Sequence, residues 1–429
     1  GAMGAKGKLP VSIDDEFKVN EGIETLEIKR LGFSIPENVG MNSKVLTKID
    51  SIANYAISKK MTPGIQVVVA RKGKVIYQKS FGNHTYESTQ KVNNTDVYDI
   101  ASLTKIVATL PNVMQEFDQG HLTLETKLKT MLPEAKNSNK ANATVLDMLT
   151  HQARFQPWIP FYKATLDSLN RPSTHFYRSE FSDEFPVHVA DKLYLRKNYN
   201  DTIVKTILDS ELLPKKQYKY SDFTFILFKE YLELHNKKSL EDLAHANFFE
   251  PLGANSIMYN PLRKMNANRI IPTENDNYFR HQIVQGYVHD MAAAMQGGIS
   301  GHAGLFANAL DVAKVMQMFL QKGSYGGRTY ISESTFNIFN TCYFCKDGNR
   351  RGVGFDKPQL GNEGPTCGCV SLTSFGHTGF TGTMTWADPE KEIVYVFLSN
   401  RTFPDSNATN KLSKENIREN IQKVIYEAI

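Results

Sequence analysis

The 429-residue sequence predicts an α/β (α+β) fold, in which an antiparallel sheet built from N- and C-terminal segments is flanked by helices and carries an inserted, mainly helical subdomain. Two β-rich runs lie near the two ends of the chain, "GIQVVVARKGKVIYQKSFG" and "GTMTWADPEKEIVYVFLSN". The sequence between them shows mostly helical periodicity. Since no repeat or low-complexity linker divides it, we expect a single domain over 41–429, with sheet segments at about 41–100 and 330–429 and helices at about 101–329.

The first elements follow from local signals. "GAMG" resembles a scar of tag removal, and we interpret residues 1–40 as this scar and an extended lead-in without a signal peptide. A helix is predicted over 42–60, with Asn42 or Ser43 as its cap. Two strands follow around Lys72-Gly73, which is typical of a hairpin.

The later elements are separated by loops that contain Gly and Pro. Helical periodicity predicts helices at 103–118, 144–151, 222–236, 239–249 and 309–322. Two further strands are predicted around Asp388-Pro389, and a closing helix over 411–428. The sheet is therefore expected to bring the two ends of the chain together.

Composition excludes several classes of protein. The chain is 41% hydrophobic, with 25 Phe and 19 Tyr, which is ample for a large core. Its net charge of +5 includes no concentrated basic tract, so no nucleic-acid partner is expected. The sequence contains no run of 18 or more apolar residues, so no membrane span is expected either.

Four cysteines are confined to a short region: Cys342, Cys345, Cys367 and Cys369. The C-x-x-C and C-x-C pattern leaves three alternatives open. The thiolates could hold a structural zinc ion, they could form two disulfides in an oxidising compartment, or they could be reduced thiols. None of these alternatives makes the cysteines catalytic.

A candidate nucleophile lies in Ser102-Leu103-Thr104-Lys105. The motif alone is weak, because a chain of this length contains about one or two chance copies, and a second copy at 88–91 lies in a polar, loop-like run. On a helix, positions i and i+3 share a face, so Lys105 can reach Ser102. Burial would lower the pKa of Lys105 toward a useful range, and a nearby helix N-terminus would favour developing negative charge.

Two further motifs fit a hydrolase site. Tyr220-Ser221-Asp222 directly precedes an apolar helix, where a phenol can relay protons. His377-Thr378-Gly379 is predicted at the start of a strand, where the backbone N–H of Phe380 can point at a carbonyl oxygen. Each motif also has a structural explanation: Tyr220 as a packing residue, His377 as a structural histidine, and Asp222 as a helix N-cap.

Together, the three motifs resemble the signatures Ser-x-x-Lys, Tyr-x-Asn and Lys/His-Thr-Gly of the serine β-lactamase and penicillin-binding-protein superfamily. The similarity is to the class C-like branch, which includes family VIII carboxylesterases and D-alanyl-D-alanine peptidases. Further phrases in register are "VLDMLTHQA" (145–153), "FFEPLGANSIMY" (248–259) and "GGISGHAGLFANALDVAKVMQMFL" (297–320). The resemblance covers about residues 42–428 and implies a β-lactamase/transpeptidase-like fold.

The resemblance also implies a mechanism. An ester or amide would be cleaved through an acyl-enzyme on Ser102, with Lys105 and Tyr220 sharing the acid and base roles. The backbone N–H groups of Ser102 and Phe380 would form the oxyanion hole. Asp222 and the 377–379 motif (His377, Thr378 and Gly379) would contact the substrate, and no cofactor would be required for catalysis.

The chain departs from the family pattern at three points. Asp222 replaces the usual Asn, which places a negative charge at the site and weighs against binding of anionic β-lactams. His377 replaces the Lys of true β-lactamases and is familiar from some D-Ala-D-Ala peptidases. The segment between Ser102 and Tyr220 is longer than is usual in the family, and the extra residues lie at about 155–200, which are rich in aromatic residues. They either line a pocket for an acyl or alcohol group, with Trp158 contacting the substrate, or form a surface loop.

The lead-in and the C-terminal tail resemble the serine-hydrolase module that follows a family 3 glycosidase module in some bacterial exported proteins. This likeness implies a glycosidase module in the parent chain and an extracytoplasmic location in the periplasm or cell envelope. Besides the hydrolase, two alternatives remain: an acyltransferase that uses a small-molecule, hydrophobic alcohol as acceptor, and a non-catalytic penicillin-binding-like recognition module. Motifs of zinc proteases and of α/β-hydrolases are absent from the sequence.

Overall fold

A six-stranded sheet joins the two ends of the chain. The computed structural model describes residues 3–359 and 364–429, and its main sheet has the strand order β16-β17-β18-β4-β5-β3. The central pair is β4 (Gly64–Arg71) with β18 (Ile393–Ser399), antiparallel from Ile65↔Ser399 to Arg71↔Ile393. The sheet predicted from the two terminal segments is thereby confirmed.

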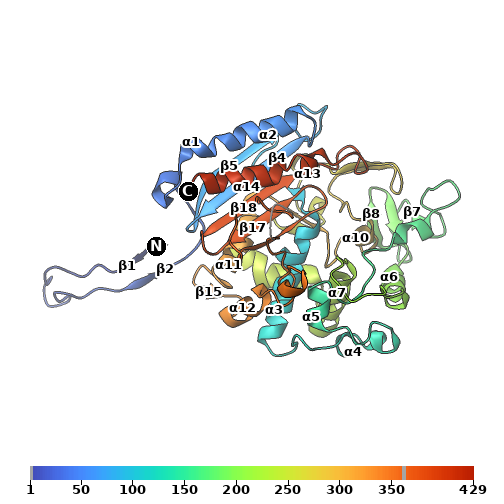
Figure 1. Cartoon of the computed structure of the whole chain (residues 1–429), viewed down its shortest axis with the longest axis horizontal. Coiled ribbons are helices and arrows are strands. Elements are labelled where there is room, and N and C mark those ends of the chain that lie inside the picture. The colour runs from blue at the N-terminus through green and yellow to red at the C-terminus, as the bar shows by residue number, and fades with distance from the viewer. Residues whose placement is uncertain (1–2, 360–363) are drawn as a thin grey trace.

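Helices cover both faces of this sheet. α1 (Ser43–Leu46), α2 (Lys48–Ser58) and α14 (Ile417–Glu427) lie together along one face, and the larger helical part of the molecule lies on the other (Figure 1). Side chains alternate along β4, so Val67 and Val69 join the core beneath α14, whereas Val68 and Ala70 join the core of the helical part. Because both faces are buried, β4 is an almost continuous apolar run rather than an alternating one.

The predicted terminal elements are present. The Asn42 side chain accepts hydrogen bonds from the N–H groups of Lys44 and Val45 and caps α1, as expected. β4 and β5 (Lys74–Gly82) form the predicted hairpin, and β17 (Met384–Asp388) pairs with β18. The predicted closing helix is divided into α13 (Lys411–Lys414) and α14, because Asn416 between them adopts a left-handed conformation with φ +51°.

The lead-in is extended, as predicted, but it also forms a hairpin. β1 (Met3–Ala5) pairs with β2 (Thr25–Glu27), and this arm projects away from the body of the protein (Figure 1). β3 (Gly32–Phe33) then joins the edge of the main sheet in parallel with β5.

The predicted helix over 103–118 consists of three different turns. Ala101–Leu103 forms a 3-10 turn (η2), Lys105–Thr109 a π-helical turn (η3), and Leu110–Asp118 the α-helix α3. Pro111 at the second position of α3 has no N–H to donate to the preceding turn, which gives a local reason for the irregular winding before it. π-helical turns are frequent at functional sites.

The other predicted helices of the middle region are α5 (Val145–Leu149), α7 (Phe223–Asn236), α8 (Leu240–Ala244) with the π-helical turn η6 (His245–Phe249), and α11 (Ala309–Leu320). Helices that the periodicity did not predict are α4 (Leu128–Met131), α6 (Tyr199–Asp209), α9 (Glu250–Leu252), α10 (Met291–Met295) and α12 (Glu333–Asn340). The remaining strands are β6 (Tyr98–Asp99), β7 (Tyr177–Arg178), β8 (Val187–Ala190), β9 (Leu193–Leu195), β10 (Met258–Tyr259), β11 (Glu274–Asp276), β12 (Gln282–Val284), β13 (Leu305–Ala307), β14 (Ser324–Tyr325), β15 (Arg328–Thr329) and β16 (Phe375–Thr378).

The four cysteines form two local disulfides, Cys342–Cys345 and Cys367–Cys369. Since each sulfur is bonded to another sulfur, the four thiolates that a zinc site at these positions needs are not present. Of the three alternatives, the structure therefore contains the disulfides. No helix in the described ranges has the length and apolar character that crossing a bilayer requires.

Candidate active site

Ser102 lies in the 3-10 turn η2, directly after a strained residue. The preceding Ala101 has φ +47°, a left-handed conformation that is unusual for a residue with a Cβ. Its N–H donates to Asp99 Oδ1 at 2.8 Å, and its side chain is buried, which helps to hold this conformation. Such strain persists only where the surroundings over-determine it, and it concentrates at functional sites.

The structure brings the Ser102 hydroxyl together with both predicted proton-transfer groups. Lys105 Nζ lies 2.9 Å from Ser102 Oγ, and the Tyr220 hydroxyl donates to the same oxygen at 3.1 Å. Lys105 reaches Ser102 from the following turn, whereas Tyr220 comes from the loop that precedes α7. Both groups are within the distance that direct proton transfer to or from Ser102 requires.

Lys105 differs from the sequence-based expectation in its charge. Its Nζ lies 2.7 Å from Asp222 Oδ1 and donates to the carbonyl oxygen of His302 at 3.0 Å. Burial lowers the pKa of Lys105, but Asp222 and Tyr220 outweigh burial and raise this pKa above its ordinary value. The prediction that the pKa of Lys105 falls is therefore wrong, because it took account of burial but not of the Asp222 carboxylate.

Asp222 is likewise more than a helix cap. It occupies the N-cap position of α7, yet its side chain makes no capping hydrogen bond and instead pairs with Lys105. Burial raises the pKa of Tyr220, and Lys105 offsets this only in part. The resting site thus contains an ammonium group, a carboxylate and a neutral phenol.

His151 supports the Tyr220 loop, a role that sequence reasoning missed. Its Nδ1 accepts the Ser221 backbone N–H at 3.2 Å, and its ring centroid lies 4.7 Å from that of Tyr220. Burial and the nearby Arg351 lower the pKa of His151, so the ring is neutral. The signal for this residue was present in the phrase at 145–153, which contains it.

The motif at 377–379 lies at the end of strand β16, so its predicted place at the start of a strand is wrong. The strand already begins at Phe375, and the chain turns after Gly379, whose N–H bonds to the Thr383 carbonyl at 2.8 Å. A Cβ on Gly379 would lie 2.8 Å from the Ile100 carbonyl oxygen. Glycine is therefore required for β16 to approach the residues that lead into Ser102.

Phe380 follows this close approach and lies beside the same cleft as Ser102. Its backbone N–H bonds to no group within residues 3–359 or 364–429, so it is available to an incoming oxygen. The Phe380 ring is 55% exposed and lies beneath the Arg401 guanidinium, 4.5 Å from the ring centroid. This arrangement fits the predicted oxyanion donor.

His377 is buried and neutral. Its Nδ1 lies 2.6 Å from the Thr378 carbonyl oxygen, which assigns the ring proton to Nδ1. Burial is the main cause that lowers the pKa of His377, to about 4. Its Nε2 has no partner among the described residues and can accept a hydrogen bond. Thr378, next to it, also lines the cleft.

The candidate site opens into a cleft of about 1030 Å³. Trp158, Tyr162 and Met291 form an apolar part of its wall. Its cationic groups are Arg351, Lys357, Arg401 and Arg418. A pocket of this size accommodates a peptide-sized or drug-sized molecule.

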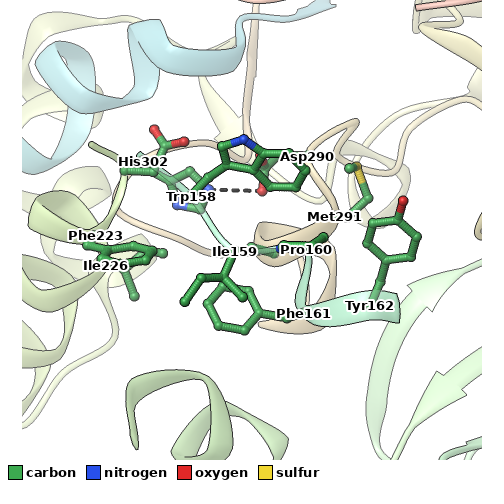
Figure 2. Close-up of a pocket in the computed structure, with 12 residues that line it drawn as sticks. Trp158, Ile159, Pro160, Phe161, Tyr162, Phe223, Ile226, Asp290, Met291 and His302 are labelled. Carbon is green, nitrogen blue, oxygen red and sulfur yellow. Dashed lines mark hydrogen bonds and ion pairs between the residues drawn. The ribbon is translucent and has the colours of Figure 1, made fainter. Parts of the chain in front are cut away.

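Part of the aromatic stretch at 155–200 reaches the site. Figure 2 shows Trp158, Phe161 and Tyr162 around a side cavity of about 30 Å³ near His302 and Asp290, which form an ion pair at 2.9 Å. That volume holds about one water molecule, so no acyl chain fits without movement. Trp158 is 55% exposed at the edge of the larger cleft. Residues 177–195 instead form the small sheet β7-β9-β8.

Comparison with known proteins agrees with this fold. A profile of the Beta-lactamase family matches residues 53–416. An Escherichia coli (strain K12) protein named "Putative D-alanyl-D-alanine carboxypeptidase" is 26% identical, with 86% of this chain and 85% of that protein covered. The N-acetylmuramyl-L-alanine amidase of Bacillus subtilis (strain 168) is 27% identical, with 85% and 83% covered.

Solved structures are similar as well. EstCE1, a hydrolase with promiscuous acyltransferase activity, has a TM-score of 0.66 at 16% identity, with 89% of this chain and 99% of that chain covered. The D-amino acid amidase of Ochrobactrum anthropi SV3 has a TM-score of 0.64 at 12% identity, with 90% and 100% covered. At these identities the likeness shows the fold. The chain belongs to the β-lactamase family and is a serine hydrolase of ester or amide bonds.

Proposed function

We propose that Ser102 is the nucleophile of an acyl-enzyme mechanism. The observation that carries this proposal is the position of Ser102 Oγ, 2.9 Å from Lys105 Nζ and 3.1 Å from the Tyr220 hydroxyl in the wall of the cleft. A serine hydroxyl becomes nucleophilic when such neighbours accept its proton. All three groups are within reach without any change in backbone conformation.

The chemical steps follow from this geometry. Ser102 Oγ attacks the substrate carbonyl carbon while its proton passes to the Lys105–Tyr220 pair. The backbone N–H groups of Ser102 and Phe380 stabilise the resulting oxyanion. The leaving alcohol or amine then takes a proton from the pair, and water enters and is deprotonated by the same pair to release the acid.

The resting protonation state limits this chemistry at neutral pH. With Lys105 charged beside Asp222 and Tyr220 protonated, the pair must first lose a proton before it can accept one from Ser102. We therefore expect kcat/KM to rise toward alkaline pH. An Asn at position 222, as is usual in the family, would remove this restraint.

We further propose that the substrate carries a carboxylate near the scissile bond. Arg401 lines the cleft beside Phe380, and within the described ranges no carboxylate forms an ion pair with its guanidinium. Burial and the neighbouring Arg418 lower the pKa of Arg401 to about 10, and Glu274 offsets this only in part, so a further anion beside Arg401 would be favourable. A substrate carboxylate would provide that partner, as in a peptide with a free C-terminus.

The test compares two activated substrates that differ only in a terminal carboxylate or its methyl ester. The wild-type protein should prefer the acid, and Arg401→Gln should lose that preference while it still cleaves the neutral substrate. Equal kcat/KM for the two substrates in the wild type would contradict the carboxylate proposal. Cleavage of either substrate that is lost in Ser102→Ala would still support the serine-hydrolase mechanism.

Acyl transfer is a second candidate because of one observation. Trp158 is 55% exposed at the cleft edge and Tyr162 lies nearby, which together offer an apolar surface to an alcohol acceptor. EstCE1, similar in fold, is a hydrolase with promiscuous acyltransferase activity. Formation of the ester of an added benzyl alcohol, at a rate that falls in Trp158→Ala, would support transfer. Exclusive release of the acid would contradict it.

We also propose an extracytoplasmic location. The two disulfides support it, because such bonds persist in oxidising compartments. Thiol alkylation of the protein taken directly from intact cells tests this: protected sulfurs agree with the proposal, and four alkylated cysteines would oppose it. The glycosidase module in the parent chain stays a prediction.

A further inference from the structure

Three potential metal ligands meet far from the candidate active site. Glu116 belongs to α3, His121 follows that helix, and His235 belongs to α7. Glu116 Oε2 lies 2.9 Å from His121 Nδ1 and 3.4 Å from His235 Nε2, and the two ring nitrogens are 3.2 Å apart. Since α7 rises about 1.5 Å per residue, the cluster lies about 20 Å along the helix from Asp222.

The triangle of ligand atoms has the dimensions of one face of a zinc tetrahedron. Zinc binds imidazole nitrogen and carboxylate oxygen at about 2.0–2.2 Å, which places neighbouring ligand atoms about 3.3–3.6 Å apart in tetrahedral geometry. The three observed separations, 2.9, 3.2 and 3.4 Å, lie close to this range. The side chains therefore need only small shifts to coordinate one ion.

The three ligand atoms converge on one point. Both ring nitrogens face Glu116 Oε2, which also accepts a hydrogen bond from the Tyr231 hydroxyl at 3.4 Å. A divalent cation between them would contact all three ligand atoms at once.

The surroundings orient these ligands while leaving the site accessible. The other oxygen of Glu116, Oε1, accepts a hydrogen bond from Asn236 Nδ2 at 2.9 Å. The His235 ring stacks on Tyr231, with ring centroids 5.5 Å apart. Partners of this kind fix ligand orientation in metal sites. The Glu116 side chain is 5% exposed, whereas His121 and His235 are 42% and 39% exposed, so an ion can enter and keep a water ligand.

We propose that Glu116, His121 and His235 bind one divalent transition-metal ion, with zinc the best match to this ligand set. The ion ties the C-terminal end of α3 to the C-terminal end of α7. These two helices follow directly after the turns that carry Lys105 and Asp222. The distance from Ser102 makes the ion structural, and hydrolysis at Ser102 does not depend on it.

The test is zinc titration of the full chain after treatment with a chelator, followed by calorimetry and by thermal unfolding. We expect one zinc ion per chain and a higher Tm with zinc. Cobalt, used as a spectroscopic probe, should give the visible absorption of a tetrahedral Co²⁺ complex. Both effects should be lost in His121→Gln and in His235→Gln, since glutamine keeps a polar group but replaces the imidazole ligand.

His245→Gln serves as the matched control, because His245 is 49% exposed and lies outside the cluster. It should bind zinc as the wild type does. Hydrolysis of an activated ester by all three variants shows that they are folded. Absence of zinc binding in the folded wild type would overturn the proposal, as would binding that persists when His121 and His235 are both replaced.

Discussion

Helices α3 and α7 share one polar cluster near their N-terminal ends and a second near their C-terminal ends. The most deeply buried charged side chain is a lysine in the first cluster and a glutamate in the second. Near their N-terminal ends, the protein's own cation, Lys105, is fully buried and paired with Asp222. At their C-terminal ends, the nearly buried carboxylate of Glu116 faces two half-exposed imidazoles and no lysine or arginine in the described ranges pairs with it. The helical part that contains both clusters is visible in Figure 1.

The two clusters receive their positive charge in different ways. The lysine side chain supplies a cation that is covalently attached and held in place beside Ser102, although it must lose a proton before it can accept one from the serine. A carboxylate and two imidazoles supply no fixed positive charge, so under the proposed metal site that end takes its cation from a bound ion. Catalysis is therefore expected to depend on the first cluster and thermal stability on the second.

The largest expected effect distinguishes Lys105, the proposed proton acceptor, from a buried lysine outside the cleft. We predict that Lys105→Met lowers kcat/KM by about 10³-fold or more, because Ser102 loses its main proton acceptor. Lys229 offers a control: it is 8% exposed and ion-paired with Glu230 and Glu233 on α7, away from the cleft. Lys229→Met should lose stability but retain kcat/KM. Equal losses of activity in the two variants would mean that Lys105 acts through stability alone.

Acid should destabilise the catalytic end of the molecule through His377. The pKa of His377 is about 4 in the folded protein and 6.5 in its ordinary state. Between pH 4 and pH 6.5, His377 is therefore protonated in the unfolded chain but neutral in the folded one, which favours unfolding. Stability is therefore retained above pH 6.5 and falls by about 3 kcal/mol as the pH approaches 4. The depressed pKa of His151 adds to the same loss.

Urea unfolding at pH 7 and pH 4.5 measures this effect. His377→Asn should make the difference between the two pH values smaller, whereas His245→Asn, at an exposed position, should leave it unchanged. If the difference is the same in His377→Asn as in the wild type, the burial argument for this histidine is wrong.

A smaller effect is expected at Asp222. Asp222 raises the pKa of Lys105, so Asp222→Asn should let Lys105 lose its proton at lower pH. We predict that the acid limb of the kcat/KM profile moves to lower pH. The measurement is the pH dependence of ester hydrolysis in both proteins, and an unmoved limb would exclude Lys105 as the titrating group.

The smallest effect concerns catalysis when metal is removed. If the two helix ends have separate roles, chelation should lower Tm yet change kcat/KM by less than about twofold, which corresponds to about 0.4 kcal/mol. Parallel activity and unfolding measurements with and without zinc compare the two ends directly. A large loss of activity on chelation would show that the ends are coupled.

Much of the fold and the principal members of the candidate site could be predicted because their signals are local. The alternation and turn residues around Lys72-Gly73 identify a hairpin, and the i, i+3 spacing places Lys105 beside Ser102. The order of the motifs then allowed Tyr220 and Phe380 to be placed near the same site. The motif at 377–379 was assigned to the wrong end of its strand, because strand limits depend on where the partner strand β17 begins.

Contacts between distant segments were not predictable in the same way. The sequence shows that Asp222 replaces Asn, but whether its side chain caps α7 or reaches Lys105 depends on how closely η3 packs against that helix. The carbonyl of His302 lies 197 residues from Lys105, and although His302 belongs to the phrase at 297–320, nothing local in that phrase indicates a contact with Lys105. The Glu116–His121–His235 cluster was missed for the same reason, since its third member comes from another helix and the spacing matches no common metal motif.

The most direct test of the central claim is the intact mass of the protein after brief incubation with a penicillin or with an activated short-chain ester, next to Ser102→Ala. The mechanism predicts an added acyl mass, or product release where turnover is too fast to trap it, and the loss of both in the variant. An adduct or turnover that survives in Ser102→Ala would contradict Ser102 as the nucleophile.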